Sequence, residues 1–150
     1  MTMSYHYVEC GLDNVMIENM APCVDDAGEE VYFIPNILGL HKVITHGIIT
    51  HAVGMSPTEL RFLRTEMGMT QAELARVVKK DHQTVGRWER GETPLDQNAE
   101  AVIRAIAAQR LGIDPELSME EIAERCVPSA QVARILIDGS DPSEYKLKAA

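Results

Sequence analysis

Long apolar runs are absent from this sequence, and cysteines and aromatic residues are few. No run approaches the roughly 20 apolar residues that a membrane-spanning helix requires. The start, MTMSYHYVECG, lacks a basic region followed by an apolar one. We therefore expect a cytoplasmic protein with no membrane partner. The three cysteines (Cys10, Cys23 and Cys126) are odd in number and widely separated, which does not resemble a disulfide framework.

Motifs for catalysis are also missing. There is no HExxH, no GxSxG and no glycine-rich phosphate loop, so we expect neither an enzyme nor a cofactor. A length of 150 residues allows one domain or two small ones, and excludes large enzyme folds. Although only 5% of residues are aromatic, 45% are hydrophobic and 25% charged, which is typical of a folded protein.

Positive charge is scarce and unevenly distributed. The net charge is −9. Residues 1–55 hold one basic and seven acidic side chains, and residues 112–150 hold four and eight. Residues 56–111 hold nine Lys and Arg against eight Asp and Glu, so any polyanion should bind this central region.

The first third, residues 1–54, predicts a small antiparallel sheet followed by a helix. Residues 5–10 alternate in part between apolar and polar, residues 15–17 and 31–34 are short apolar runs, and turn signals separate them. Asn36 can cap a helix that begins at Ile37 and is apolar on two faces. Such a helix must pack against more than its own sheet, either in a dimer interface or against the next domain.

Residues 55–112 predict an all-α domain, which gives an α+β protein overall. SPTE at 56–59 and TQAE at 70–73 are capping boxes, and Asp81 and Asp96 can cap two further helices. The remainder, residues 113–150, predicts a short helix from Ser118 to about Cys126, a strand at residues 133–137 and a tail.

The central helices have the arrangement of a helix-turn-helix, in which the second of two crossing helices enters the major groove of DNA. TQAELA at 70–75, followed by QTVGRWERG at 83–91, closely resembles the Cro and phage-repressor (XRE) type of DNA-binding domain. The resemblance covers roughly a third of the chain, and the match of several positions in order makes it specific.

The resemblance implies a role for each polar position. Gln71, at the start of the second helix, would bind a phosphate, and Gly86 would allow close approach to DNA. Gln can pair with adenine and Arg with guanine. Lys79 and Lys80 would meet phosphates. The implied DNA-binding set is Gln71, Lys79, Lys80, His82, Gln83, Thr84, Arg87 and Arg90, with the groove-facing residues being His82, Gln83, Thr84 and Arg87.

Two further positions are structural by the same resemblance: Arg64 and Glu89 would form an ion pair between the first and third helices. Leu63, Leu74, Val85 and Trp88 are expected in the core. One departure concerns the turn, where Lys79 replaces the usual Gly. A left-handed conformation would cost Lys about 1 kcal/mol relative to Gly, which favours a turn of different shape.

The order of a sheet-bearing domain before a repressor-like domain is similar to that of MqsA-type antitoxins. Those proteins bind zinc through two CxxC pairs, which this sequence lacks. His6, Cys10 and Cys23 could form at most an improvised site, so we expect no metal. His41, His46 and His51 lie about 140° apart around a helix and cannot converge on one metal.

The sequence therefore predicts a sequence-specific transcriptional regulator, a repressor acting as a homodimer on an inverted repeat in double-stranded DNA. The helix from Ile37 is the first candidate for the dimer interface, and the helix from residue 96 is the second. One alternative is an antitoxin that neutralises a partner toxin protein and autoregulates its operon. Another is a sensor whose flanking segments bind a small effector.

Overall fold

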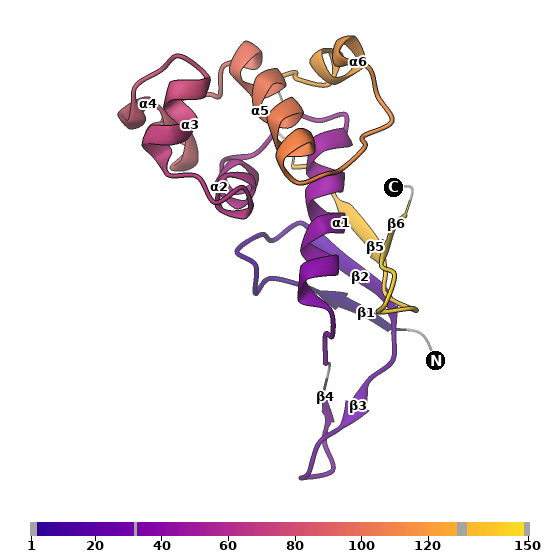
Figure 1. The fold of residues 1–150 in the computed structure, drawn as a ribbon. Helices are drawn as coiled ribbons and strands as arrows, with labels where there is room; N and C mark the ends of the chain where they lie inside the picture. Colours follow the sequence, from indigo (N-terminus) through magenta and orange to yellow (C-terminus); the bar gives the residue numbers. More distant parts are fainter. Residues whose placement is uncertain (1–2, 32, 129–131, 149–150) are drawn as a thin grey trace.

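The computed structural model describes residues 3–31, 33–128 and 132–148. Its fold is α+β, as expected from the sequence (Figure 1). The elements follow in the order β1 (Met3–His6), β2 (Val15–Met20), β3 (Cys23–Val24), β4 (Glu30–Val31), α1 (Ile37–Thr50), α2 (Pro57–Glu66), α3 (Gln71–Val77), α4 (His82–Glu89), α5 (Gln97–Arg110), α6 (Met119–Glu124), β5 (Ile135–Asp138) and β6 (Lys146–Leu147).

Strands from both ends of the chain form one four-stranded sheet with the order β1-β2-β5-β6. β2 runs antiparallel to β1 but parallel to β5, with Val15 opposite Ile135 and Ile17 opposite Ile137. The expected antiparallel pairing is found between β1 and β2, and the parallel pairing of β2 with β5 adds a neighbour that the sequence did not indicate. Parallel neighbours need a long crossover, and the connection here contains every helix in the described part of the chain. Residues 113–150, expected as a separate C-terminal segment, supply two strands of this sheet, β5 and β6.

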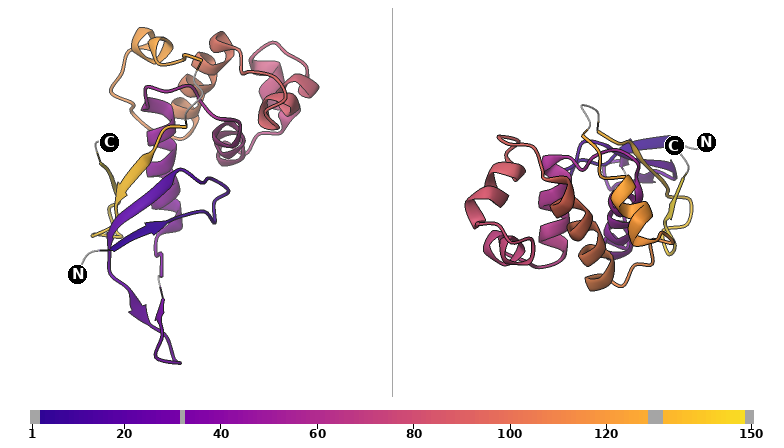
Figure 2. Two further views of the ribbon diagram at one scale, coloured as in Figure 1. Left: turned by 180° about the vertical axis from the view of Figure 1, so that it is seen from behind. Right: turned by 90° about the horizontal axis from the view of Figure 1, so that it is seen from above.

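The remaining two strands, β3 and β4, form a separate hairpin that projects away from the sheet (Figures 1 and 2). Cys23 lies opposite Val31, and the described residues from Cys23 to Phe33 are exposed. Of the strand expected at residues 31–34, Val31 lies in β4, whereas Phe33 and Ile34 lie outside it and residue 32 is outside the described residues. No described residue of this hairpin belongs to the hydrophobic core.

Helix α1 connects the sheet to the helical region. Asn36 caps it by accepting a hydrogen bond from the Gly39 N–H at 3.2 Å. One face packs on the sheet so closely that a Cβ at Gly47 would lie 3.1 Å from Ile135. The other side contacts α5, so burial against the helical region accounts for part of the second apolar face. At the start of the helix, Ile37 and Leu38 remain 41% and 86% exposed.

A buried ionic network fixes the end of α1 to α5. The fully buried Arg104 donates two hydrogen bonds to the Glu100 carboxylate, at 3.0 and 2.7 Å. It also donates to three backbone carbonyls at and after the end of α1, those of Ile49 (3.2 Å), His51 (2.7 Å) and Val53 (2.7 Å). These bonds satisfy carbonyls that a helix end leaves without partners. The network joins α5 to the end of α1, the helix that packs on the sheet.

Candidate nucleic-acid interface

The helices of the central region begin where the capping residues predict. Ser56 and Glu59 form a complete capping box at α2, and Thr70 and Glu73 form another at α3. Asp81 caps α4 by accepting a hydrogen bond from the Thr84 N–H at 2.8 Å. Hydrogen bonds from Thr84 lower the pKa of the Asp81 carboxyl below its ordinary value. Each helix of the motif therefore has a defined starting point.

The turn between α3 and α4 keeps a left-handed residue. Lys79 has φ 62°, and the Lys80 N–H donates to the Ala75 carbonyl at 2.9 Å, which is the hydrogen bond that closes a Schellman motif. Our expectation of a differently shaped turn is wrong. Lys79 adopts this strained conformation because the turn must bring α4 across α3.

Apolar packing and one glycine set how α3 and α4 cross. The predicted core residues Leu63, Leu74, Val85 and Trp88 are buried, which confirms that prediction. Gly86 is also buried, and a Cβ there would lie 3.0 Å from the Arg90 guanidinium and 3.4 Å from the Gln71 amide oxygen. Gly86 therefore leaves room for two side chains of the protein itself, and the expected close approach to DNA stays a prediction.

Arg64 and Glu89 form an ion pair that ties α2 to α4. Arg64 donates from Nε to Glu89 at 2.5 Å and from Nη2 at 2.9 Å, and Nη1 donates to the Met69 carbonyl at 2.9 Å. The hydrogen bond to Glu89 raises the pKa of Arg64 further above its ordinary value. Gln71 joins this cluster, because its Nε2 donates to the same carboxylate at 3.2 Å. One of the two N–H groups of the Gln71 amide thus remains for another acceptor.

The expected groove-facing residues do not all have the same environment. His82, Gln83 and Arg87 are exposed on α4. Thr84 is half-buried, and its hydroxyl donates to Asp81 at 3.0 Å, so it also stabilises the start of the helix. Lys79 and Lys80 are exposed at the turn. Within the described chain, the side chains of Lys79, Lys80, Gln83 and Arg87 form no hydrogen bond or ion pair.

Arg90 has a partner that the sequence analysis did not anticipate. Its Nε and Nη2 donate to the two carboxylate oxygens of Glu92, at 3.0 and 3.1 Å. Both side chains are exposed, at 58% and 53%. This hydrogen bonding raises the pKa of Arg90 and lowers that of Glu92. The structure therefore places Arg90 at the end of α4, already bound to a carboxylate.

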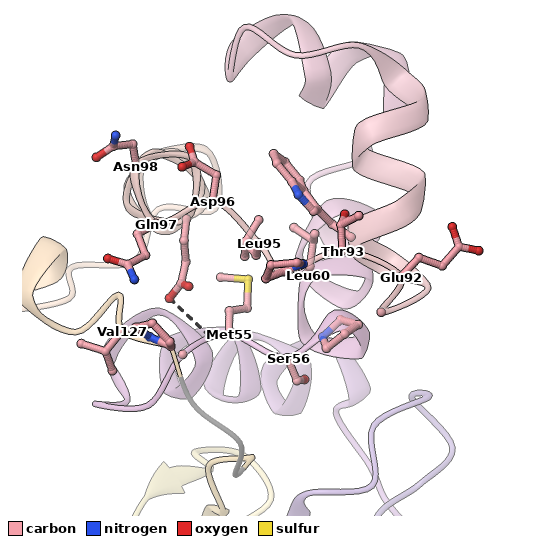
Figure 3. A pocket seen from close by; sticks show the side chains of 17 residues that line it. Met55, Ser56, Leu60, Glu92, Thr93, Leu95, Asp96, Gln97, Asn98 and Val127 are labelled. Carbon is pink, nitrogen blue, oxygen red and sulfur yellow. Dashed lines mark hydrogen bonds between the residues drawn. The ribbon is translucent and has the colours of Figure 1, made fainter.

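A cleft of about 990 Å³ lies beside the far end of α4 and the start of α5 (Figure 3). Its lining includes Trp88, Leu60 and Met55, and the Met55 N–H donates to Glu100 at 3.3 Å, drawn as the dashed line. The charged residues that line it are all acidic, namely Glu92, Asp96 and Glu100. The described lining of the cleft therefore offers no basic side chain to a phosphate, whereas Lys79 and Lys80 are exposed at the turn before α4.

A second buried carboxylate, that of Glu59, organises the start of α2. Glu59 is fully buried, and besides its role in the capping box it accepts a hydrogen bond from Asn14 at 3.1 Å. His51 lies 3.1 Å from the same carboxylate. The capping box identified Glu59, but nothing local in the sequence indicates its two distant partners.

The remaining histidines and cysteines are dispersed. His41 lies 3.1 Å from Glu66, near the end of α2, and 3.0 Å from the Tyr7 hydroxyl. His51 instead lies beside Glu59, at the start of α2. Cys10 is half-buried beside β1, whereas Cys23 is exposed in the hairpin. Among the described residues, no group of three or more His, Cys, Asp or Glu side chains is arranged to hold a metal ion.

These features define a DNA-binding domain of the helix-turn-helix class. Residues 60–116 match the family model described as helix-turn-helix, so this part of the chain is a helix-turn-helix domain of the Cro and phage-repressor (XRE) type, as the sequence resemblance implied. No match was found among the curated proteins or among the solved structures. In the described part of the chain, no helix has the length and apolar character needed to cross a bilayer.

Proposed function

We propose that this protein is a sequence-specific transcriptional regulator that represses promoters by binding DNA through α4. The observation that carries the proposal is the row of exposed, unpaired polar side chains on α4 and at the preceding turn. Gln83 and Arg87 have the hydrogen-bonding groups that distinguish base pairs in the major groove, each contributing about 1–3 kcal/mol of discrimination. Lys79 and Lys80, exposed at the turn, would neutralise phosphates without reading sequence.

The charge distribution supports a regulator with weak sequence-independent binding. The acidic side chains outnumber the basic ones strongly in residues 1–55 and 112–150, whereas residues 56–111 are close to neutral. Only a small surface can therefore attract the DNA backbone. Because sequence-independent affinity scales with the number of phosphates neutralised, it should be low, and base contacts should provide a large share of operator binding.

We further propose that two copies bind an inverted repeat. One helix-turn-helix domain reads a half-site, and a dimer reads two half-sites about one helical turn apart. The first candidate for the dimer interface is the exposed apolar surface at the start of α1, formed by Phe33, Ile37 and Leu38. The second is α5, where Val102 is 36% exposed.

The antitoxin alternative has one observation in its favour, which is the uncovered apolar surface of the N-terminal region. Val24, Phe33 and Leu38 are 68%, 66% and 86% exposed. Exposed apolar side chains that form a contiguous patch mark binding sites for partner proteins. Stable co-purification of the chain with a small basic protein encoded beside it would favour this alternative over a purely transcriptional role.

The proposed function is tested by selecting bound duplexes from a random DNA library and titrating the best one by fluorescence anisotropy. Arg87→Ala should weaken binding by about 1–3 kcal/mol and relax the preference at one base position. Lys80→Ala should weaken all sequences alike and reduce the salt slope by about one. Arg134→Ala changes an exposed arginine just before β5, outside the helix-turn-helix, and serves as the control. If no duplex is enriched even at low salt, the domain is a scaffold for proteins rather than for DNA.

A further inference from the structure

At the end of α4, two side chains of kinds that commonly bind phosphate, Arg90 and Gln71, each donate hydrogen bonds to a carboxylate. Arg90 and Gln71 both lie against Gly86, so their side chains are neighbours. Arg90 donates two hydrogen bonds to Glu92, and Gln71 donates one to Glu89. Arginine and amide side chains are common partners of DNA phosphates. In the free protein, each of these side chains therefore already donates to an acidic side chain.

The two carboxylates are not equivalent. Glu89 is nearly buried, with 4% of its side chain exposed, and it is held by Arg64, so it is part of the framework. Glu92 is exposed and has Arg90 as its ion-pair partner. It follows Gly91, which has φ 72°, and its N–H donates to the Arg87 carbonyl at 2.9 Å. The backbone after α4 thus directs Glu92 back toward the helix.

We propose that Glu92 is an intramolecular competitor of DNA phosphate for Arg90, and that it thereby limits the sequence-independent affinity of the domain. This inference rests on the proposed function and revises one part of it, because Arg90 then contributes less to DNA binding than its charge implies. The geometry is that of two parallel N–H···O bonds, the same arrangement in which a guanidinium binds a phosphate. A phosphate must displace Glu92 or approach it against like charge.

The consequence for binding is measurable as a salt dependence. Each phosphate neutralised by a cation contributes about 0.9 to the slope of log K against log salt concentration. Because Glu92 neutralises Arg90, the slope measured for the wild type should be smaller than the slope expected if every exposed Lys and Arg of the DNA-binding surface neutralised a phosphate. Glu92→Gln keeps the size of the side chain and removes its charge. It should steepen the slope by about one and tighten binding to any duplex about 3- to 10-fold near 0.1 M salt.

A double-variant comparison separates competition from a general charge effect. Arg90→Ala should change the slope little in the wild-type background, but should reduce it by about one in the Glu92→Gln background. Glu120→Gln is the matched control, because it removes one exposed carboxylate from α6, away from α4. The assays are anisotropy titrations at four salt concentrations with the selected operator and with an unrelated duplex.

The outcomes distinguish the two proposals. Enrichment of no duplex by the wild type would overturn the proposed function. Normal operator binding with equal salt slopes for Glu92→Gln and Glu120→Gln would overturn the competition alone. A lower melting temperature of Glu92→Gln with an unchanged slope would show that the ion pair only stabilises the end of α4. A steeper slope that requires Arg90 supports the inference.

Discussion

Replacement of Arg104 by methionine tests whether the buried network joins the two halves of the fold. Methionine keeps much of the length of the side chain but removes its charge and all of its donors. The Glu100 carboxylate, with 3% of its side chain exposed, would keep only the Met55 N–H of the hydrogen bonds described. The carbonyls of Ile49, His51 and Val53 would lose their arginine partner.

The expected cost follows from the burial of the pair. Removing one partner of a buried ion pair typically costs about 3–5 kcal/mol, because the other charge remains buried without compensation. For a chain of this length we expect the melting temperature to fall by about 6 to 20 °C. Adding Glu100→Gln should restore a substantial part of the loss, since the uncompensated charge is then removed.

Urea unfolding provides the measurement, with fluorescence of the single tryptophan, Trp88, reporting on the helical region and far-ultraviolet circular dichroism on the whole chain. Arg110→Met, at the exposed end of the same helix, is the control and should change stability by less than about 0.5 kcal/mol. A loss below 1 kcal/mol for Arg104→Met, or no recovery in the double variant, would refute the reasoning.

Three further predictions concern single side chains. Lys79→Gly should stabilise the protein by about 1 kcal/mol in urea unfolding because it relieves a left-handed lysine, whereas Lys80→Gly should not. The pKa of the Asp81 carboxyl is lowered by hydrogen bonds from the first turn of α4, so its stabilising contribution is complete at neutral pH. That contribution should be lost as the pH falls between about pH 5 and pH 2, and unfolding midpoints of wild type and Asp81→Asn should converge there. Burial raises the pKa of the Cys126 thiol to about 12, so iodoacetamide should modify the exposed Cys23 rapidly and Cys126 only on unfolding.

Each of these has a contrary result. Equal stability of the two glycine variants would show that the turn is not strained. A difference between wild type and Asp81→Asn that is as large at pH 2 as at pH 7 would show that the charge of Asp81 does not cause it. Alkylation of Cys126 at the rate of Cys23 would show that α6 opens readily.

The local elements of the fold were predictable because their signals are short in range. Capping boxes at Ser56 and Thr70 placed the starts of α2 and α3, and apolar spacing along residues 97–110 placed α5. The helix-turn-helix followed from the same positions. These signals depend on residues within a few positions of one another, which a single sequence displays directly.

Features that join distant residues were missed. The pairing of β2 with β5 links residues about 120 positions apart, and no local pattern specifies the partner of a short strand. The network of Glu100 and Arg104 contains an i, i+4 pair that is visible in the sequence, but such pairs are usually exposed. The Arg90 partner was missed for a different reason, because Glu92 lies beyond the helix and its direction depends on the turn at Gly91.

The shared sheet has a consequence for how DNA sites could be spaced. β1 and β2 precede the helices and β5 and β6 follow them, so the helical region is connected at both ends to the same sheet (Figure 2). A module anchored at both ends cannot swing as it could on a single flexible tether. Two copies associated through their sheets would hold their α4 helices at a separation that the fold determines. Lengthening the spacer of an operator by a few base pairs should then abolish paired binding.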